Sequence, residues 1–250
     1  LARNHLHAER VPVKLTLAIK RCLRIKFKID MRNNARQWLL LITLVGIIIR
    51  LPYWEVIPAS FDEVNQTVFA LLIAEGRSFP LVANDAYTGP FYVYLLAGLL
   101  RLGITNPLIG RVIVMITGIL TIPATYGWVR TLGDNKTAGL IAAALVAINP
   151  DLILVNSHIG GATFLLPFFT TIFLLCLALA IHRDNYWWLV GGAIAAGLAL
   201  QSNPIPGLVI MGGLLWLLWQ AYRKPQLGKR WPLWPISAGF IILLVYSPVI

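Results

Sequence analysis

The chain has 250 residues, of which 58% are hydrophobic and 12% charged, and it carries a net charge of +11. A soluble domain usually has about 25% charged residues, so this composition excludes an ordinary soluble protein. Apolar runs of roughly 20 residues recur along the chain, and they lack the alternation that a β-barrel would show. We therefore expect an all-α, polytopic membrane helical bundle.

The first 36 residues form a basic tail. They hold ten Lys and Arg against Glu9 and Asp30, which is +8 of the total charge of +11. Basic residues beside a first membrane span indicate the cytoplasmic side and attract anionic lipid headgroups, so membrane lipids and not nucleic acid are the expected partner. Met31 precedes the first span closely, so residues 1–30 could be extra upstream sequence. At the other end an apolar run stops at Ile250, which suggests truncation at the C-terminus.

Seven spans are predicted after the tail, and we treat residues 37–250 as one transmembrane domain. The spans cover about 38–54, 108–129, 137–149 extending toward 155, 162–181, 186–202, 205–222 and 233–250. With the tail in the cytoplasm, 17 of the 21 Lys and Arg fall on the cytoplasmic side, and six of the ten acids fall outside. This distribution satisfies the positive-inside rule from loop to loop.

The first outer loop covers residues 55–107, a length that is uncommon unless the loop carries function. Its segment 63–76 predicts a short amphipathic helix that ends at Gly76 and has one apolar face, made of Val64, Val68, Leu71 and Leu72. The segment 89–102 is apolar but too short to cross a bilayer. We expect a helix at the outer interface, with Tyr92 and Tyr94 near the headgroups.

An adjacent acidic pair, Asp62-Glu63, opens this loop helix. Carboxylates are costly near lipid, so such a pair is a candidate functional site. Two simpler roles compete with that hypothesis: Asp62 could cap the helix N-terminus, and Glu63 could be a first-turn acid favoured by the helix dipole.

The order of these signals carries a resemblance over about residues 37–220. Phe61-Asp-Glu63 is followed by Gly89-Pro-Phe-Tyr-Val-Tyr94, by Arg111 at the start of a span, and by Asn149-Pro150 at the end of the next. This order resembles the polyprenyl-phosphate-sugar-dependent glycosyltransferases of the GT-C superfamily. The most similar group is family 39, with the protein O-mannosyltransferases and the lipid A aminoarabinose transferases.

The resemblance implies an inverting membrane glycosyltransferase with its active site on the outer face of a prokaryotic plasma membrane. Such an enzyme moves a sugar from a polyprenyl-phosphate donor to a hydroxyl of a glycan, lipid or protein acceptor. By the resemblance, Asp62 is the catalytic carboxylate, with Glu63 in support. A positioned carboxylate suits this reaction because it can take the proton of a weakly nucleophilic hydroxyl.

The leaving phosphate needs cationic or N–H partners, and six residues are candidates for binding substrate: Arg77, Arg101, Arg111, Tyr92, Asn156 and His158. Arg50, at the membrane edge, is a further candidate cation. Each has an alternative role, because Arg77 and Arg101 could lie at the headgroups, Tyr92 could belong to an aromatic belt, and a lone His is more often structural. The third outer turn, from Gln201 to Pro206, could also line the site.

No Cys/His cluster has metal-ligand spacing, and no cofactor is implied firmly. Many relatives carry a second acid about a dozen residues after the proline of the second outer loop, where this chain reads Gly160-Gly-Ala-Thr163. A divalent metal bridging the two loops is therefore less favoured but stays open. Two other functions also remain: a flippase or other transporter of lipid-linked sugars, and a non-catalytic membrane scaffold.

Overall fold

The computed structural model describes residues 34–52, 57–81, 88–106, 108–156, 158–185, 187–223 and 233–246. The regular structure in these ranges is helical. The elements in chain order are α2 (Ala35–Arg50), α3 (Phe61–Ala74), α4 (Phe91–Arg101), α5 (Ile109–Gly133), α6 (Lys136–Ile148), α7 (Pro150–Val155), the 3₁₀-helix η1 (Ala162–Leu165), α8 (Leu166–His182), α9 (Trp187–Ser202), α10 (Gly207–Arg223) and α11 (Leu233–Tyr246). The prediction of an all-α protein is confirmed for this part of the chain.

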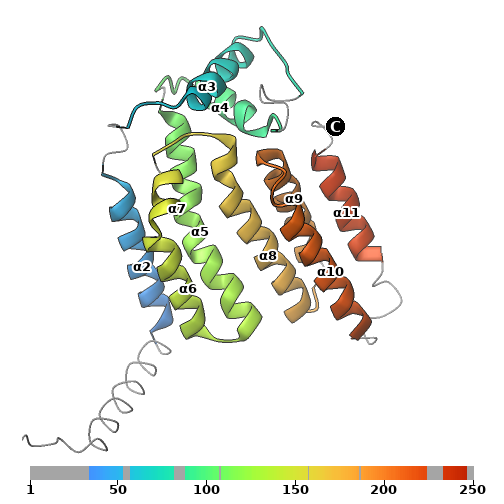
Figure 1. The fold of residues 1–250 in the computed structure, drawn as a ribbon. Helices are drawn as coiled ribbons and strands as arrows, with labels where there is room; N and C mark the ends of the chain where they lie inside the picture. The colour runs from blue at the N-terminus through green and yellow to red at the C-terminus, as the bar shows by residue number, and fades with distance from the viewer. Residues whose placement is uncertain are drawn as a thin grey trace, which may run out of the picture.

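The long helices stand side by side in one bundle, as Figure 1 shows for α2, α5, α6, α8, α9, α10 and α11. Each of the seven predicted spans coincides with one of these helices, and α7 continues the third. Two described helices, Ile109–Gly133 and Ala162–His182, are long and apolar enough to cross a membrane by length and composition alone. The others are shorter, so a total of seven crossings stays a prediction.

The surface of α2 fits a lipid environment. Leu40, Leu44 and Ile48 follow one another at one-turn spacing and are each more than half exposed. Such a row is unfavourable in water, but it costs nothing against lipid tails. The opposite side of α2 packs against α5 and α6, in a cluster that includes Ala35, Ile122 and Leu140.

Helices α3 and α4 lie together across one end of the bundle (Figure 1), and we call this pair the α3–α4 unit. The predicted loop helix at 63–76 is present as α3, and Gly76 does end it. With φ of +74°, Gly76 adopts the left-handed conformation that only glycine tolerates well. Its N–H donates to Ile73 O over 3.0 Å, and the Arg77 N–H donates to Leu72 O over 2.9 Å.

The predicted apolar face of α3 lies on the exposed side of the helix. Val64, Val68 and Leu71 are between 47% and 50% exposed. The buried face instead consists of Glu63, Gln66, Ala70 and Ile73. The helix therefore turns two polar side chains toward the bundle, and these side chains fix it there.

The predicted interfacial helix at 89–102 is α4, which packs on α3 and does not run along the bundle (Figure 1). Tyr94 is partly exposed and donates its hydroxyl to Pro80 O over 3.2 Å. Tyr92 differs from the prediction, because its ring is buried in the cluster that joins α3, α4, α5 and η1. It therefore contributes to the core of the α3–α4 unit and does not face the headgroups.

Gln201, at the end of α9, ties α4 to the bundle. Its main-chain carbonyl accepts the Gly89 N–H over 2.6 Å, and its side-chain oxygen accepts the Phe91 N–H over 3.2 Å. Its side-chain amide also donates to Val245 O of α11. Since Phe91 is the first residue of α4, Gln201 satisfies one of the main-chain donors that a helix start leaves open.

Candidate active site

Ser60 immediately precedes α3 and acts as its N-cap. It has an extended conformation, and its hydroxyl oxygen accepts the Glu63 N–H over 3.2 Å. The expectation that Asp62 caps this helix is therefore wrong. Asp62 lies inside the first turn with an exposed side chain, and no hydrogen bond or ion pair involves it within the described residues. Its carboxylate is open to a reaction partner.

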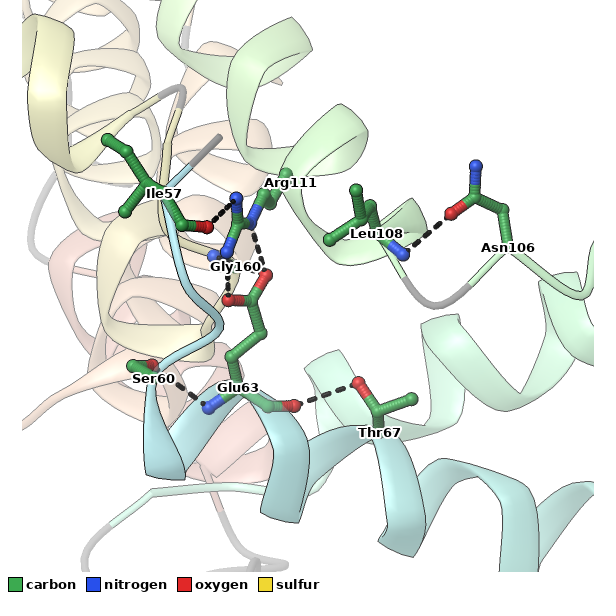
Figure 2. Close-up of polar contacts among 8 residues, drawn as sticks. All are labelled: Ile57, Ser60, Glu63, Thr67, Asn106, Leu108, Arg111 and Gly160. Carbon is green, nitrogen blue, oxygen red and sulfur yellow. Dashed lines mark hydrogen bonds and ion pairs between the residues drawn. The ribbon is translucent and has the colours of Figure 1, made fainter. Parts of the chain in front are cut away.

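Glu63, its neighbour, is buried in an ion pair with Arg111 (Figure 2). Arg111 donates from Nε to Oε1 over 2.8 Å and from Nη2 to Oε2 over 2.9 Å. The Gly160 N–H adds a third donor to Oε1 over 3.2 Å, and Arg111 Nη1 donates to Ile57 O over 2.9 Å. The two side chains are 4% and 0% exposed, so neither charge has contact with water.

The ion pair fixes α3 at its first turn. A guanidinium fork and a carboxylate match in a two-bond geometry, and the buried pair is strong only while both partners are present. Arg111 sits at the start of α5, so the pair joins the first turn of α3 to the first turn of a bundle helix. In this arrangement its donors to Glu63 and Ile57 O are used, and they are not open to a phosphate.

Two main-chain amides, one in the loop between α7 and η1 and one at the first residue of η1, also hold α3. The Gly160 N–H reaches Glu63, and the Ala162 N–H donates to the Gln66 side-chain oxygen over 3.1 Å. Glu63 and Gln66 are three residues apart on one helix face. At the position where a second acid was considered, the chain therefore supplies N–H donors to α3.

Asn156 and His158, two of the predicted substrate-binding residues, lie inside the structure. Asn156 is 1% exposed and packs against α5 at Gly118, and its Oδ1 has no hydrogen-bond partner within the described ranges. The ring of His158 lies between two main-chain carbonyls, with Nε2 2.9 Å from Pro52 O and Nδ1 3.4 Å from Ile153 O. His158 thus joins the end of the α2 segment to α7. Binding of substrate by either residue stays a prediction.

The outer cations differ in how open they are. Arg77 is 72% exposed and pairs with Glu75 over 3.0 Å, so it remains accessible. Arg101 donates to the last carbonyls of α3, at Ile73 and Ala74, over 3.1 and 3.0 Å. That contact is favourable because a cation complements a helix C-terminus.

The Arg50 side chain is buried and donates hydrogen bonds to main-chain carbonyls beside the break between α6 and α7. It donates to Gly46 O and Ala147 O over 3.0 Å each, and to Val146 O over 3.3 Å. Pro150 has no N–H and cannot donate to Val146 O four residues before it. Arg50 replaces that missing donor and so fixes the end of α2 to the proline break, and as placed it is not open to a phosphate.

Three further features concern the site and its surroundings. Burial, followed by the nearby charge of Glu63, raises the pKa of the Tyr92 phenol above its ordinary value, so this hydroxyl stays protonated. Among the residues that the structure describes, no three His, Cys, Asp or Glu side chains gather as metal ligands would. A surface hollow of about 270 Å³ lies at the start of α2, near Trp38, at the end of the bundle opposite the α3–α4 unit.

In the described residues, the fold is a helical bundle with the α3–α4 unit across one end, attached there by a buried ion pair. The family model for dolichyl-phosphate-mannose-protein mannosyltransferases matches residues 87–250, and the chain belongs to this family. It is thus a membrane glycosyltransferase of the GT-C type, as the sequence resemblance indicated. No curated protein and no solved structure matches the chain.

Sequence reasoning missed several residues that hold the site. Ser60 and Glu63 form the Ser-x-x-Glu pattern that often marks a helix start, and this signal was available. In the structure only half of that pattern is used, because the Glu63 side chain reaches Arg111 and does not return to its own helix end. The contacts of Gln66, Gly160 and Gln201 had no comparable local signal.

Proposed function

We propose that the protein transfers a sugar from a polyprenyl-phosphate donor to an acceptor hydroxyl, with Asp62 as the general base. The acceptor is a glycan, lipid or protein, and the reaction takes place on the extracytoplasmic side with inversion at the sugar carbon. The distribution of Lys and Arg supports that orientation, since 17 of 21 fall on the side of the tail.

The different surroundings of the two acids carry this proposal. Glu63 is buried and holds three donors, so its carboxylate is committed to structure. Asp62 is exposed and is not needed as a helix cap, because Ser60 has that role. A general base must be able to reach the hydroxyl whose proton it accepts, and of the two only Asp62 meets this requirement as placed.

The position of Asp62 is also well defined, although its side chain is open. It lies in the first turn of α3, one residue before the buried ion pair, and α3 is held by α4, α5 and the α7–η1 loop. A base that rigid neighbours already hold in position loses little conformational entropy when it is oriented toward the acceptor. Such preorganisation can lower the activation barrier by several kcal/mol.

The phosphate of the donor needs positive charge nearby, and Arg77, just after α3, and Arg101, at the end of α4, are both exposed cations. The bond of Arg77 to Glu75 is exposed, so a phosphate can replace that carboxylate at small cost. Arg101 lies near the same end of α3 but is engaged by carbonyls. Arg77 and Arg101 both lie at the C-terminal end of α3, roughly 20 Å from Asp62 at 1.5 Å per residue, so donor-phosphate binding by either residue stays a prediction.

The test compares steady-state transfer by wild type, Asp62→Asn and Glu75→Gln in liposomes, with a panel of polyprenyl-phosphate sugars and acceptors. Loss of general-base assistance should reduce kcat of Asp62→Asn by roughly 10²–10⁴-fold. Glu75→Gln removes an exposed acid just after the C-terminal end of α3, away from Asp62, and should retain kcat. A folded Asp62→Asn protein with wild-type kcat would contradict the proposal.

A further inference from the structure

Gly160 lies where the α7–η1 loop passes between the Glu63 carboxylate and the start of α5 (Figure 2). A Cβ atom placed on Gly160 would be 2.9 Å from Glu63 Oε1, 3.1 Å from Arg111 N and 3.1 Å from Gly110 C. Two of these neighbours are main-chain atoms of the same helix start. They cannot shift independently, so the Glu63 side chain would have to move.

The requirement for glycine comes from this close approach and not from the backbone conformation. Among the described glycines, positive φ angles occur at Gly76 and Gly103, and Gly160 is not one of them. An alanine could therefore adopt the local backbone angles. Its methyl group would, however, disturb the arrangement of the three donors around the Glu63 carboxylate.

We propose that Gly160 is a positioning residue for Asp62, an inference that rests on the proposed role of Asp62 as base. Gly160 allows the loop to approach closely, and its N–H then holds Glu63 against Arg111. Glu63 and Asp62 are adjacent in the first turn of α3, so fixing one fixes the backbone of the other. The Ala162–Gln66 bond repeats the attachment one turn further along α3.

The test uses an Asp62→Cys reporter in a background with Cys22→Ser and Cys176→Ala. A membrane-impermeant methanethiosulfonate reagent measures how fast the thiol at position 62 reacts. Gly160→Ala is compared with Gly161→Ala, which makes the same change one residue later. A Cβ on Gly161 would meet two Phe164 ring atoms at 3.1 Å each, and a side-chain ring can shift to accommodate it.

We expect Gly160→Ala to change the labelling rate several-fold, while Gly161→Ala leaves it near the value of the parent. Equal rates in the two variants would overturn the proposal. In the protein with Asp62 intact, Gly160→Ala should lower kcat by at least about tenfold with little change in KM, because small misplacements of a reacting group are costly. A shifted labelling rate with unchanged kcat would support the positioning role and contradict Asp62 as base.

A second variant keeps the test decisive if Gly160→Ala does not fold. Gln66→Met removes the acceptor of the Ala162 N–H and adds no atom near Gly160. The proposal predicts a changed labelling rate at position 62 for Gln66→Met. Parent-like labelling in Gln66→Met would show that the loop does not set the position of α3.

Discussion

Replacing Glu63 by alanine leaves the Arg111 guanidinium buried without a counterion. In the wild type, three donors converge on the carboxylate at 2.8, 2.9 and 3.2 Å, and both side chains are shielded from water. Removing one partner of such a pair costs about 3–5 kcal/mol. This is a large share of the ~5–15 kcal/mol that stabilises an ordinary fold.

Thermal unfolding of purified protein in detergent measures this cost. For a chain of this length, 1 kcal/mol lowers Tm by about 2–4 °C, so Glu63→Ala should lower Tm by roughly 6–20 °C. Glu75→Ala is the matched control, because Glu75 pairs with Arg77 on the surface of the same region. An exposed pair contributes at most about 1 kcal/mol, which corresponds to a decrease of about 4 °C or less.

A double substitution separates the energy of the Glu63–Arg111 interaction from the cost of leaving one buried charge unpaired. Glu63→Leu with Arg111→Met removes both charges and should recover most of the stability that Glu63→Ala loses. If Glu63→Ala and Glu75→Ala lower Tm equally, the buried pair does not hold α3 and the reasoning fails.

Three further predictions concern the contacts around the site. Arg50→Lys loses the forked guanidinium that donates to Ala147 O and Val146 O, so it should lower the free energy of unfolding by about 2–3 kcal/mol. Arg183→Lys, at an exposed position, should hardly change that free energy, and equal losses in the two variants would refute this. Ser60→Ala should cost about 1 kcal/mol and Ser60→Asp much less, because aspartate also caps; an equal loss for both would contradict the cap. Gln201→Leu should speed hydrogen exchange of the Phe91 amide more than that of the Tyr94 amide, which donates to Pro90 O within the same region. Unchanged exchange of the Phe91 amide would contradict its contact with Gln201.

The positions of the bundle helices could be predicted from the sequence because burial in lipid requires long apolar runs, and such runs are local. The end of α3 was also predictable, since Gly76 supplies a conformation that few other residues adopt. The family followed from the order of Asp62-Glu63, Arg111 and Asn149-Pro150, although each of these signals is weak alone.

The orientation of α3 could not be predicted in the same way. Helical periodicity groups Val64 and Val68 on one apolar face, but it does not distinguish a face that packs on the protein from a face that is exposed. In the structure Glu63 and Gln66 face inward because Arg111, Gly160 and Ala162 supply their partners. These partners lie 48 to 97 residues away in the chain. A pattern within one helix contains no information about them.

The same limit applies to the buried cations. Arg50 and Arg111 were both considered as phosphate ligands, because a sequence shows their charge and approximate depth but not their neighbours. The Arg50 guanidinium donates to main-chain carbonyls in the break before Pro150, and the Arg111 guanidinium pairs with the Glu63 carboxylate. Both contacts depend on the packing of separate helices, so only the three-dimensional arrangement distinguishes them from accessible Arg77.

The most direct test of Asp62 as the base is a single-turnover experiment with donor already bound. Wild-type and Asp62→Asn enzyme are saturated with a polyprenyl-phosphate sugar in liposomes, mixed with acceptor, and quenched over time. The account predicts similar donor affinity and a transfer rate lower by roughly 10²–10⁴-fold in Asp62→Asn. Transfer at the wild-type rate by the folded, donor-bound Asp62→Asn protein would contradict it.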